Sequence, residues 1–167
     1  MEIREVRQKD ASELLLFFEQ VGGESDNLTF GKEGLQISEA EELQFIKGII
    51  GSSNEWMIVA IKEGRIVGNA GLSKLPRRMK HRGRITICVR RDTWRQGIGS
   101  KLLEYLLAVA EENGLEQIEL EVRKDNIAAI RLYESFGFKK IATIPDFFKI
   151  EDDYIDFDYM ILKMGVE

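Results

Sequence analysis

Residues 94–103, WRQGIGSKLL, place Gly97 and Gly99 one residue apart, immediately before an amphipathic stretch rich in leucine. Glycine lowers the stability of a helix by roughly 1 kcal/mol per interior position relative to alanine. The β-branched run RITICV, residues 84–89, precedes the glycines and predicts a strand. A strand, a glycine turn and a helix in succession can bind a phosphate group, because the first N–H groups of a helix lack an intrahelical acceptor and the helix dipole is positive there.

Two common glycine motifs do not match this turn. The dinucleotide-binding fingerprint has a third glycine three positions after the second, where this chain has Leu102. The phosphate loop of nucleoside triphosphatases ends in Gly-Lys-Ser or Gly-Lys-Thr, whereas here the order is Gly99-Ser100-Lys101. Taken alone, the turn fits a tight strand–helix connection without a ligand equally well.

Composition and charge restrict the classes of protein to which the chain can belong. The chain has 167 residues, of which 44% are hydrophobic and 32% charged, so we expect one globular domain over residues 1–167. The net charge of −5 argues against nucleic acid as a partner. The chain lacks a run of 18 apolar residues and an apolar signal segment at its start, so we expect no membrane partner and no secretion. Together with the single Cys88, this predicts a cytoplasmic protein.

The hydrophobic periodicity and the turn residues predict eleven elements. Strands are expected at 3–7, 56–61, 65–73, 84–89, 118–122, 139–144 and 154–162, and helices at 11–21, 39–50, 97–113 and 126–136. The order β-α-α-β-β-β-α-β-α-β-β predicts an α+β fold, a mixed sheet with helices on its faces and one βαβ crossover, and excludes a doubly wound nucleotide fold.

Several element ends carry recognisable signals. Asp10 with Glu13, and Ser38 with Glu41, have the spacing of capping boxes at the starts of the first two helices. Gly22 and Gly23 are expected to end the first helix, Asn113-Gly114 the third and Gly137 the fourth. Residues 62–64 are expected to form a hairpin turn, and Pro145 to mark the end of a strand.

A second motif follows the glycine turn. Its pattern, N-x-x-A-x-x-x-Y-x-x-x-G-F, is formed by the following residues: Asn126, Ala129, Tyr133, Gly137 and Phe138. With both motifs in this order and at this separation, residues 85–138 resemble the core of the GNAT superfamily of N-acetyltransferases. The core is similar to that of the ribosomal-protein N-terminal alanine acetyltransferases. The resemblance implies the GNAT-type acyl-CoA N-acyltransferase fold, with a mostly antiparallel central sheet flanked by helices.

The resemblance implies that acetyl-CoA is the acyl donor and that the turn holds its pyrophosphate. The cofactor-binding residues it suggests are Val89, Trp94, Arg95, Gln96, Gly97, Ile98, Gly99, Ser100, Asn126 and Ala129. Trp94 departs from the family, which usually has Arg or Gln three residues before the first glycine. Its backbone N–H is retained, and Arg95 and Gln96 are candidates to replace the side-chain contact. No metal is implied, because the chain has one His, one Cys and no cluster with ligand spacing.

Acetyl transfer by direct attack in a ternary complex requires a base, an oxyanion donor and an acid. The resemblance suggests Tyr133 as the acid that protonates the departing thiolate, and Glu121 as the base, with Glu119 as the alternative. Backbone N–H groups near Val89 are candidates for the oxyanion. A half-buried helix tyrosine and a solvated strand carboxylate are the structural interpretations of Tyr133 and Glu121. We interpret Cys88 as a buried strand residue rather than an acetyl-cysteine nucleophile.

The acceptor is expected to be a primary amine of a small molecule or a protein N-terminus. GNAT proteins build acceptor sites from the region between the first two helices and from the last hairpin, here residues 22–36 and 145–157. The carboxylates and aromatic rings of 145–157 suit a cationic amine, although the acidic run 151–158 also fits a solvated hairpin. The basic run 77–84, RRMKHRGR, fits a solvated loop, or a contact to CoA phosphates or an acidic protein surface.

Two other functions remain open at this point. One is a catalytically silent GNAT domain that binds acyl-CoA and regulates a partner, and the other is an enzyme that uses a longer acyl-CoA. A homodimer paired through the last strands is a further expectation from the resemblance.

Overall fold

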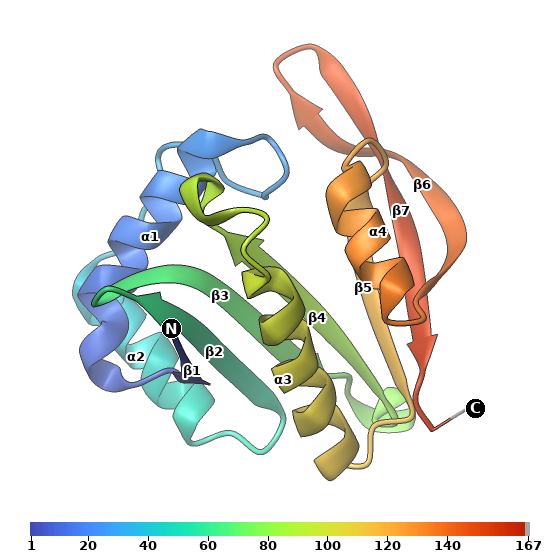
Figure 1. The fold of residues 1–167 in the computed structure, drawn as a ribbon, viewed down its shortest axis with the longest axis horizontal. Helices are drawn as coiled ribbons and strands as arrows, with labels where there is room; N and C mark the ends of the chain where they lie inside the picture. Colours follow the sequence, from blue (N-terminus) through green and yellow to red (C-terminus); the bar gives the residue numbers. More distant parts are fainter. Residues whose placement is uncertain (166–167) are drawn as a thin grey trace. The chain divides into compact units, whose positions relative to one another are not determined.

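The computed structural model describes residues 1–165, and its α+β fold confirms the predicted order of elements (Figure 1). The helices are α1 (Ala11–Glu24), α2 (Glu39–Ile50), α3 (Ile98–Glu112) and α4 (Ile127–Ser135). The strands are β1 (Glu2–Glu5), β2 (Glu55–Lys62), β3 (Arg65–Lys74), β4 (Arg82–Val89), β5 (Gln117–Arg123), β6 (Lys139–Ile150) and β7 (Asp153–Lys163). None of the helices described in residues 1–165 has both the length and the apolar character needed to span a membrane.

The chain divides into two compact units, which we call unit 1 (residues 1–73 and 86–108) and unit 2 (residues 74–85 and the chain from 109 onward). In unit 1, β1 pairs antiparallel with β2, and β2 with β3. In unit 2, the start of β4 runs parallel to β5, which pairs antiparallel with β7, and β7 with β6. Because β4 contributes to both units, the strands follow the order β1-β2-β3-β4-β5-β7-β6, a mixed and mostly antiparallel arrangement. That the chain is a single domain stays a prediction.

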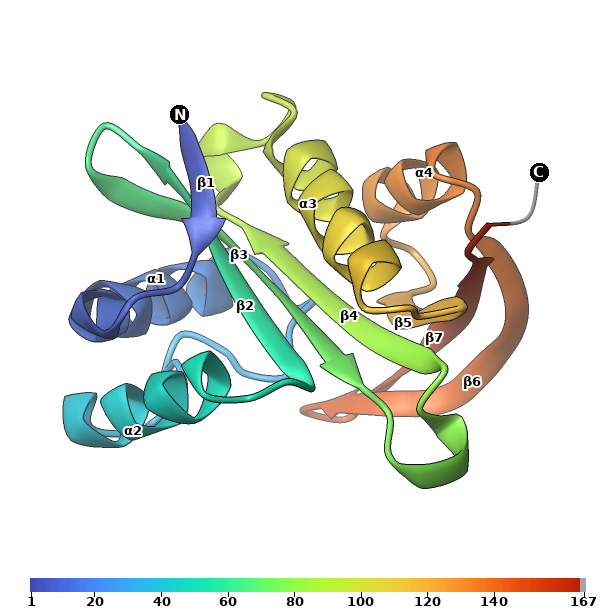
Figure 2. The same cartoon turned by 90° about the horizontal axis from the view of Figure 1, so that it is seen from below.

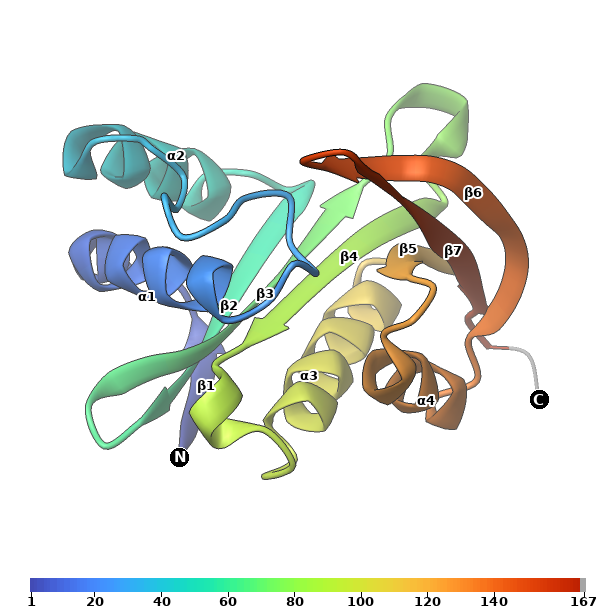
Figure 3. The same cartoon turned by 90° about the horizontal axis from the view of Figure 1, so that it is seen from above.

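Unit 1 packs helices on both faces of its strands. Helices α1 and α2 lie side by side on one face of β2 and β3 (Figure 2), and the first part of α3 lies on the other (Figure 3). Residues of β2 alternate between the two faces, so Met57 and Val59 join the core beneath α1 and α2. On the opposite face, a Cβ at Gly68 would lie 2.9 Å from Leu102 and 3.2 Å from Ile98, so Gly68 lets α3 approach the sheet closely.

The prediction that Gly22 and Gly23 end the first helix is wrong, because α1 continues to Glu24. Gly22 has a helical conformation. Because it has no side chain, it leaves room for a neighbouring segment of the chain. A Cβ at Gly22 would lie 2.1 Å from the carbonyl oxygen of Gly31, so the segment after α1 packs directly on the helix backbone.

A capping box at Asp10 and Glu13 is also a wrong prediction. The Asp10 carboxylate accepts hydrogen bonds from the Arg7 N–H (2.7 Å) and from the Arg4 guanidinium (2.7 and 2.9 Å), and it makes no cap bond to α1. Glu13 instead accepts a hydrogen bond from the Ile66 N–H, at 3.3 Å. Both carboxylates therefore tie α1 and the segment before it to the rest of unit 1.

Gly22→Ala is expected to lower the free energy of unfolding by about 1–3 kcal/mol, the usual cost of overpacking. Gly48→Ala is the matched control, because Gly48 also lies inside a helix but its Cβ would meet no atom within 4 Å. This second change should stabilise the protein by about 0.5–1 kcal/mol, since alanine favours a helix over glycine. Urea unfolding of both variants measures the two effects, and equal shifts of the same sign would contradict the close packing at Gly22.

Most of the other local predictions are confirmed. Ser38 and Glu41 form a reciprocal capping box at the start of α2. Gly64 in the β2–β3 turn, Gly114 after α3 and Gly137 after α4 all have positive φ angles, which glycine adopts without strain.

Two predictions on strand ends are wrong. Pro145 lies inside β6, in the irregular stretch between Ile144 and Phe148 where the pairing with β7 shifts, and β6 continues to Ile150. A proline is tolerated at such an irregularity because no ladder hydrogen bond is lost. The basic run 77–84 is not a loop throughout, because its last three residues begin β4.

Glu42 is a buried carboxylate on α2 for which sequence analysis gave no role. Its exposed fraction is 1%, and neither carboxylate oxygen has a hydrogen-bond partner among the described residues. Burial raises the pKa of Glu42, because it disfavours the charged form. A carboxyl group whose pKa is raised by folding favours the folded state at low pH, and this advantage is lost as the pH rises through the folded-state pKa.

We therefore expect Glu42→Gln to raise the free energy of unfolding at pH 7 by about 1–3 kcal/mol, since the amide avoids the cost of a buried charge. At pH 4 the carboxyl group is protonated in the folded protein, and the difference should shrink. Urea unfolding at both pH values measures this. Glu39→Gln, at an exposed position of the same helix, is the control and should change stability by less than about 0.5 kcal/mol. Equal stability of the Glu42 variant and the wild type at pH 7 would contradict the prediction.

Candidate functional site

The glycine turn joins β4 to α3 within unit 1. Gly97 is exposed and has a φ angle of 77°, a conformation that favours glycine, and α3 begins at the next residue. At the helix start, the Lys101 N–H donates a hydrogen bond to the Gly97 carbonyl, at 3.1 Å. The N–H groups of Ile98, Gly99 and Ser100 therefore precede the intrahelical ladder and point out of the helix end. This arrangement can bind an anion.

Trp94 folds back across the turn. Its indole Nε1 donates a hydrogen bond to the Val89 carbonyl at 2.8 Å, and the Arg91 guanidinium lies 5.4 Å from the centre of the indole ring. The indole N–H thus satisfies the carbonyl oxygen of Val89, at the end of β4. The Arg90 N–H donates to the Val67 carbonyl of β3 at 2.9 Å. Because N–H groups of successive strand residues point to opposite sides, the Val89 N–H is directed away from β3.

The neighbours of Trp94 differ in what their side chains can offer. Gln96 accepts a hydrogen bond from Lys62 Nζ at 2.8 Å and donates one to the Asp92 carbonyl at 3.4 Å, so its amide is already engaged. Arg95 is exposed and has a φ angle of 61°, the left-handed region that costs a non-glycine residue roughly 1–2 kcal/mol. The Ile98 side chain is buried in the core, so only its backbone can contact a ligand. Since the Gln96 amide is engaged, Arg95 is the better candidate for a side-chain contact to an anion.

The second motif lies in unit 2. Asn126 is the N-cap of α4, and its side chain accepts a hydrogen bond from the Ala129 N–H at 3.3 Å. Tyr133 is 8% exposed, and the centre of its ring lies 5.7 Å from that of Phe138. Tyr133 is therefore buried rather than half-buried. Asn126 of the same motif caps the start of the helix that carries Tyr133.

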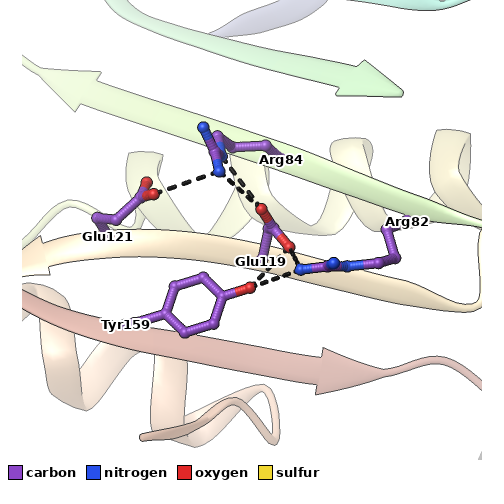
Figure 4. A network of polar contacts seen from close by, with 5 residues as sticks. All are labelled: Arg82, Arg84, Glu119, Glu121 and Tyr159. Carbon is purple, nitrogen blue, oxygen red and sulfur yellow. Dashed lines mark hydrogen bonds and ion pairs between the residues drawn. The ribbon is translucent and has the colours of Figure 1, made fainter. Parts of the chain in front are cut away.

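Glu119 and Glu121 lie on one face of β5, as predicted, but their surroundings differ (Figure 4). Glu119 is 1% exposed. One of its oxygens accepts hydrogen bonds from Tyr159 Oη (2.7 Å) and from Arg82, and the other accepts bonds from Arg84 Nη2 (2.9 Å) and Nε (3.2 Å). Arg82 also donates to Tyr159 Oη at 2.7 Å.

These contacts determine the charge of Glu119. Burial acts to raise its pKa, but hydrogen bonds from Tyr159 and Arg84 and the charge of Arg82 together lower the pKa below its usual value. A carboxylate held ionised by so many donors is a poor proton acceptor. Glu121 is less enclosed: its side chain is 21% exposed, and its Oε1 lies 3.5 Å from Arg84 Nη2. The geometry favours Glu121 over Glu119 as the candidate base.

Cys88 packs against the core of unit 1 on β4. Burial raises the pKa of its thiol to about 12, so the nucleophilic thiolate is scarce at neutral pH. This agrees with the interpretation of Cys88 as a strand residue. Within residues 1–165, His, Cys, Asp and Glu side chains form no group of three or more that could hold a metal ion.

Sequence analysis missed Arg82, Arg84 and Tyr159 as partners of the two β5 carboxylates. A signal was present, because Arg82 and Arg84 alternate with Gly83 and Ile85 in the pattern of a strand that begins two residues before the predicted start. What the sequence did not provide was the pairing that places Arg84 opposite Glu119.

Known proteins share sequence and fold with this chain. A family described as "Acetyltransferase (GNAT) family" matches residues 24–138. The [ribosomal protein bS18]-alanine N-acetyltransferase of Escherichia coli is 39% identical over 80 residues, which is 48% of this chain and 54% of that protein. This chain therefore spans about half the length of that curated relative.

Two solved structures show the same fold over the whole length. An acetyltransferase of the GNAT family from Streptococcus pneumoniae superposes with a TM-score of 0.92 at 29% identity, covering 98% of this chain and 99% of the other. The yncA protein of Salmonella typhimurium, solved with its cofactor acetyl-CoA, superposes with a TM-score of 0.84 at 19% identity, covering 100% and 95% of the two chains.

Proposed function

This chain belongs to the acetyltransferase (GNAT) family, and we propose that it transfers the acetyl group of acetyl-CoA to a primary amine of a small molecule or a protein N-terminus. The observation that carries the proposal is the glycine turn, where the N-terminus of α3 offers backbone N–H groups to an anion. Acetyl-CoA supplies an acetyl thioester, and its pyrophosphate is the anion that the turn would hold.

The turn binds through its backbone rather than through Trp94. The N–H groups of Ile98, Gly99 and Ser100 contact the pyrophosphate, and the exposed Arg95 adds a positive charge. Trp94 keeps the turn closed through its bond to the Val89 carbonyl. The Val89 N–H, directed away from β3, donates to the acetyl carbonyl oxygen as negative charge develops there.

The proposed reaction consists of proton transfers and one exchange of bonds at the acetyl carbon. Glu121 takes a proton from the ammonium group of the acceptor, directly or through water. The amine nitrogen then forms a bond to the acetyl carbon, and the carbon–sulfur bond breaks. Tyr133 donates its hydroxyl proton to the departing thiolate. The second proton of the nitrogen, which is lost as the amide forms, returns to the Tyr133 oxygen through water, and Glu121 releases its proton to the solvent.

The β6–β7 hairpin supports a cationic acceptor. The rings of Phe147, Phe148 and Phe157 cluster with centres 4.3–5.7 Å apart. Tyr154 is 59% exposed within the acidic run 151–158, and Lys149 Nζ lies 5.3 Å from the centre of its ring, a position that an ammonium group can take. Aromatic faces and carboxylates both attract an ammonium group. A peptide with N-terminal alanine is a suitable first acceptor, given the substrate in the name of the Escherichia coli relative.

The test is release of free thiol from acetyl-CoA with a panel of small amines, polyamines, aminoglycosides and N-terminal peptides. Turnover with one acceptor class supports the proposal. Binding of CoA without turnover across the panel would overturn it in favour of a silent regulatory domain. Faster turnover with a longer acyl-CoA would change the donor and keep the reaction class. Sedimentation of the same sample tests the further prediction of a homodimer.

A further inference from the structure

Arg84 joins the two carboxylates of β5 from the neighbouring strand. Its guanidinium donates twice to one oxygen of Glu119, at 2.9 and 3.2 Å, and the same Nη2 lies 3.5 Å from Oε1 of Glu121 (Figure 4). In the β4–β5 pairing, Arg84 stands opposite Glu119, two residues before Glu121. The contact with Glu121 is therefore a diagonal one, made possible by the long arginine side chain.

Glu119 is a firm anchor for Arg84. Its carboxylate is buried, and its second oxygen is held by Arg82 and Tyr159. Arg82 and Tyr159 are bonded to each other as well. A side chain with every acceptor site engaged has little freedom, so the guanidinium that it binds is held in a fixed orientation.

We propose that Arg84 is a positioning residue for acetyl transfer, which holds the Glu121 carboxylate in one place on the face of β5. This inference rests on the proposed function, in which Glu121 is the base. Glu119 acts one step further away, by fixing Arg84, whereas Arg82 and Tyr159 bind Glu119 and each other.

The other charged groups near Glu121 do not replace Arg84. Tyr159 of β7 stands opposite Glu121 in the strand register, but its hydroxyl donates to Glu119. Arg123, two residues along β5, forms an ion pair with Asp125 at 2.6 Å. Arg82 of β4 binds Glu119 and Tyr159. Arg84 thus supplies the ion pair with Glu121, at 3.5 Å.

The test compares Arg84→Gln with Arg82→Gln. Both changes remove one positive charge from the same cluster and one set of bonds to Glu119, but only Arg84 contacts Glu121. The readout is kcat and the KM for the acceptor, measured separately, with thermal unfolding to record any loss of stability. Arg84→Lys restores the charge at the same position.

Arg84→Gln is expected to lower kcat about tenfold, because a displaced base loses part of its orientation. The KM for the acceptor should change by less than kcat, because the contact positions the base rather than the ammonium group. Arg84→Lys should recover most of the lost kcat, because it restores a cation beside Glu121. Arg82→Gln should lower stability and reduce kcat by less than Arg84→Gln, because its bonds go to Glu119 and Tyr159.

Equal losses of kcat in the Arg84 and Arg82 variants, or no recovery of kcat in Arg84→Lys, would overturn the positioning role while leaving acetyl transfer intact. A wild-type protein that turns over no acceptor would withdraw both the proposed function and this inference. The two failures are therefore distinct.

Discussion

Tyr133→Phe is expected to lower kcat for acetyl transfer by about 10²–10⁴-fold, the range that a positioned general acid contributes. The change removes one oxygen atom and keeps the buried ring that packs 5.7 Å from Phe138. The thiolate of CoA would then leave without a proton from the enzyme. Since the hydroxyl acts on the leaving group, the KM for acetyl-CoA should change little. Steady-state thiol release, with acetyl-CoA and the acceptor varied in turn, measures both quantities.

Tyr105→Phe is the matched control, because it removes a tyrosine hydroxyl from α3, outside the residues assigned to the reaction. It should retain kcat, and thermal unfolding of both variants records any loss of stability. A Tyr133 variant with wild-type kcat would remove tyrosine from the mechanism and leave the acetyltransferase proposal standing. A loss of kcat that follows a loss of folded protein would mean that the hydroxyl is structural.

The strongest local signals in the sequence were sufficient to predict the order of elements. The glycine turn before α3, the strict alternation of β5 and the hairpin turn at 62–64 each follow from two or three neighbouring residues. Such signals depend on backbone geometry and on one buried face, which short-range patterns specify. The family resemblance came from two motifs of this kind at a fixed separation.

Two of the wrong predictions share a cause, a tertiary contact that the local sequence pattern does not show. By local rules Gly22 and Gly23 end a helix, but here the carbonyl of Gly31 packs against the position where a side chain of residue 22 would stand. Asp10 has the spacing of a helix cap, but Arg4 offers it a stronger, charged partner. In each case a tertiary contact outweighs the local preference, and no pattern within a few residues reports it.

The same limit applies to the candidate site. The sequence indicated Glu121 and Tyr133 through their motif, but Arg84 precedes Glu119 by 35 residues and Tyr159 follows it by 40. Only strand pairing brings these side chains together. Glu42 was more accessible to sequence reasoning, because it lies four residues before the buried Ile46 on the same face of α2. A carboxylate on a helix face that is otherwise apolar indicates a buried ionisable group.

Glu121→Gln is expected to lower kcat/KM by about 10²–10⁴-fold at neutral pH, because an amide cannot take the proton of the ammonium group. The size of the side chain is conserved, and the amide oxygen can still accept a hydrogen bond from Arg84, whose Nη2 lies 3.5 Å from Oε1 in the wild type. The fold and the binding of acetyl-CoA should therefore survive. Thiol release across a range of pH measures the effect.

The rate deficit of Glu121→Gln relative to the wild type should depend on pH. An α-amino group has a pKa of about 7.7–8.0, so above that range the acceptor is already deprotonated and needs no base. The residual rate of Glu121→Gln should accordingly rise with pH, and its deficit relative to the wild type should shrink. Glu104→Gln, an exposed change on α3 that removes the same charge, should follow the wild-type profile. A constant deficit at all pH values would contradict the role of base.

Glu119→Gln separates catalysis from structure on the same face of β5. Glu119 binds Arg82, Arg84 and Tyr159, and its lowered pKa means that its contribution to stability is present above the unfolded-state pKa and is lost as the pH falls through the folded-state pKa. Replacing it should therefore cost stability first, by about 1–3 kcal/mol. Replacing Glu121 should cost rate first. If the two variants instead lose rate and stability in equal measure, the two carboxylates act as one structural cluster and the base must be sought elsewhere.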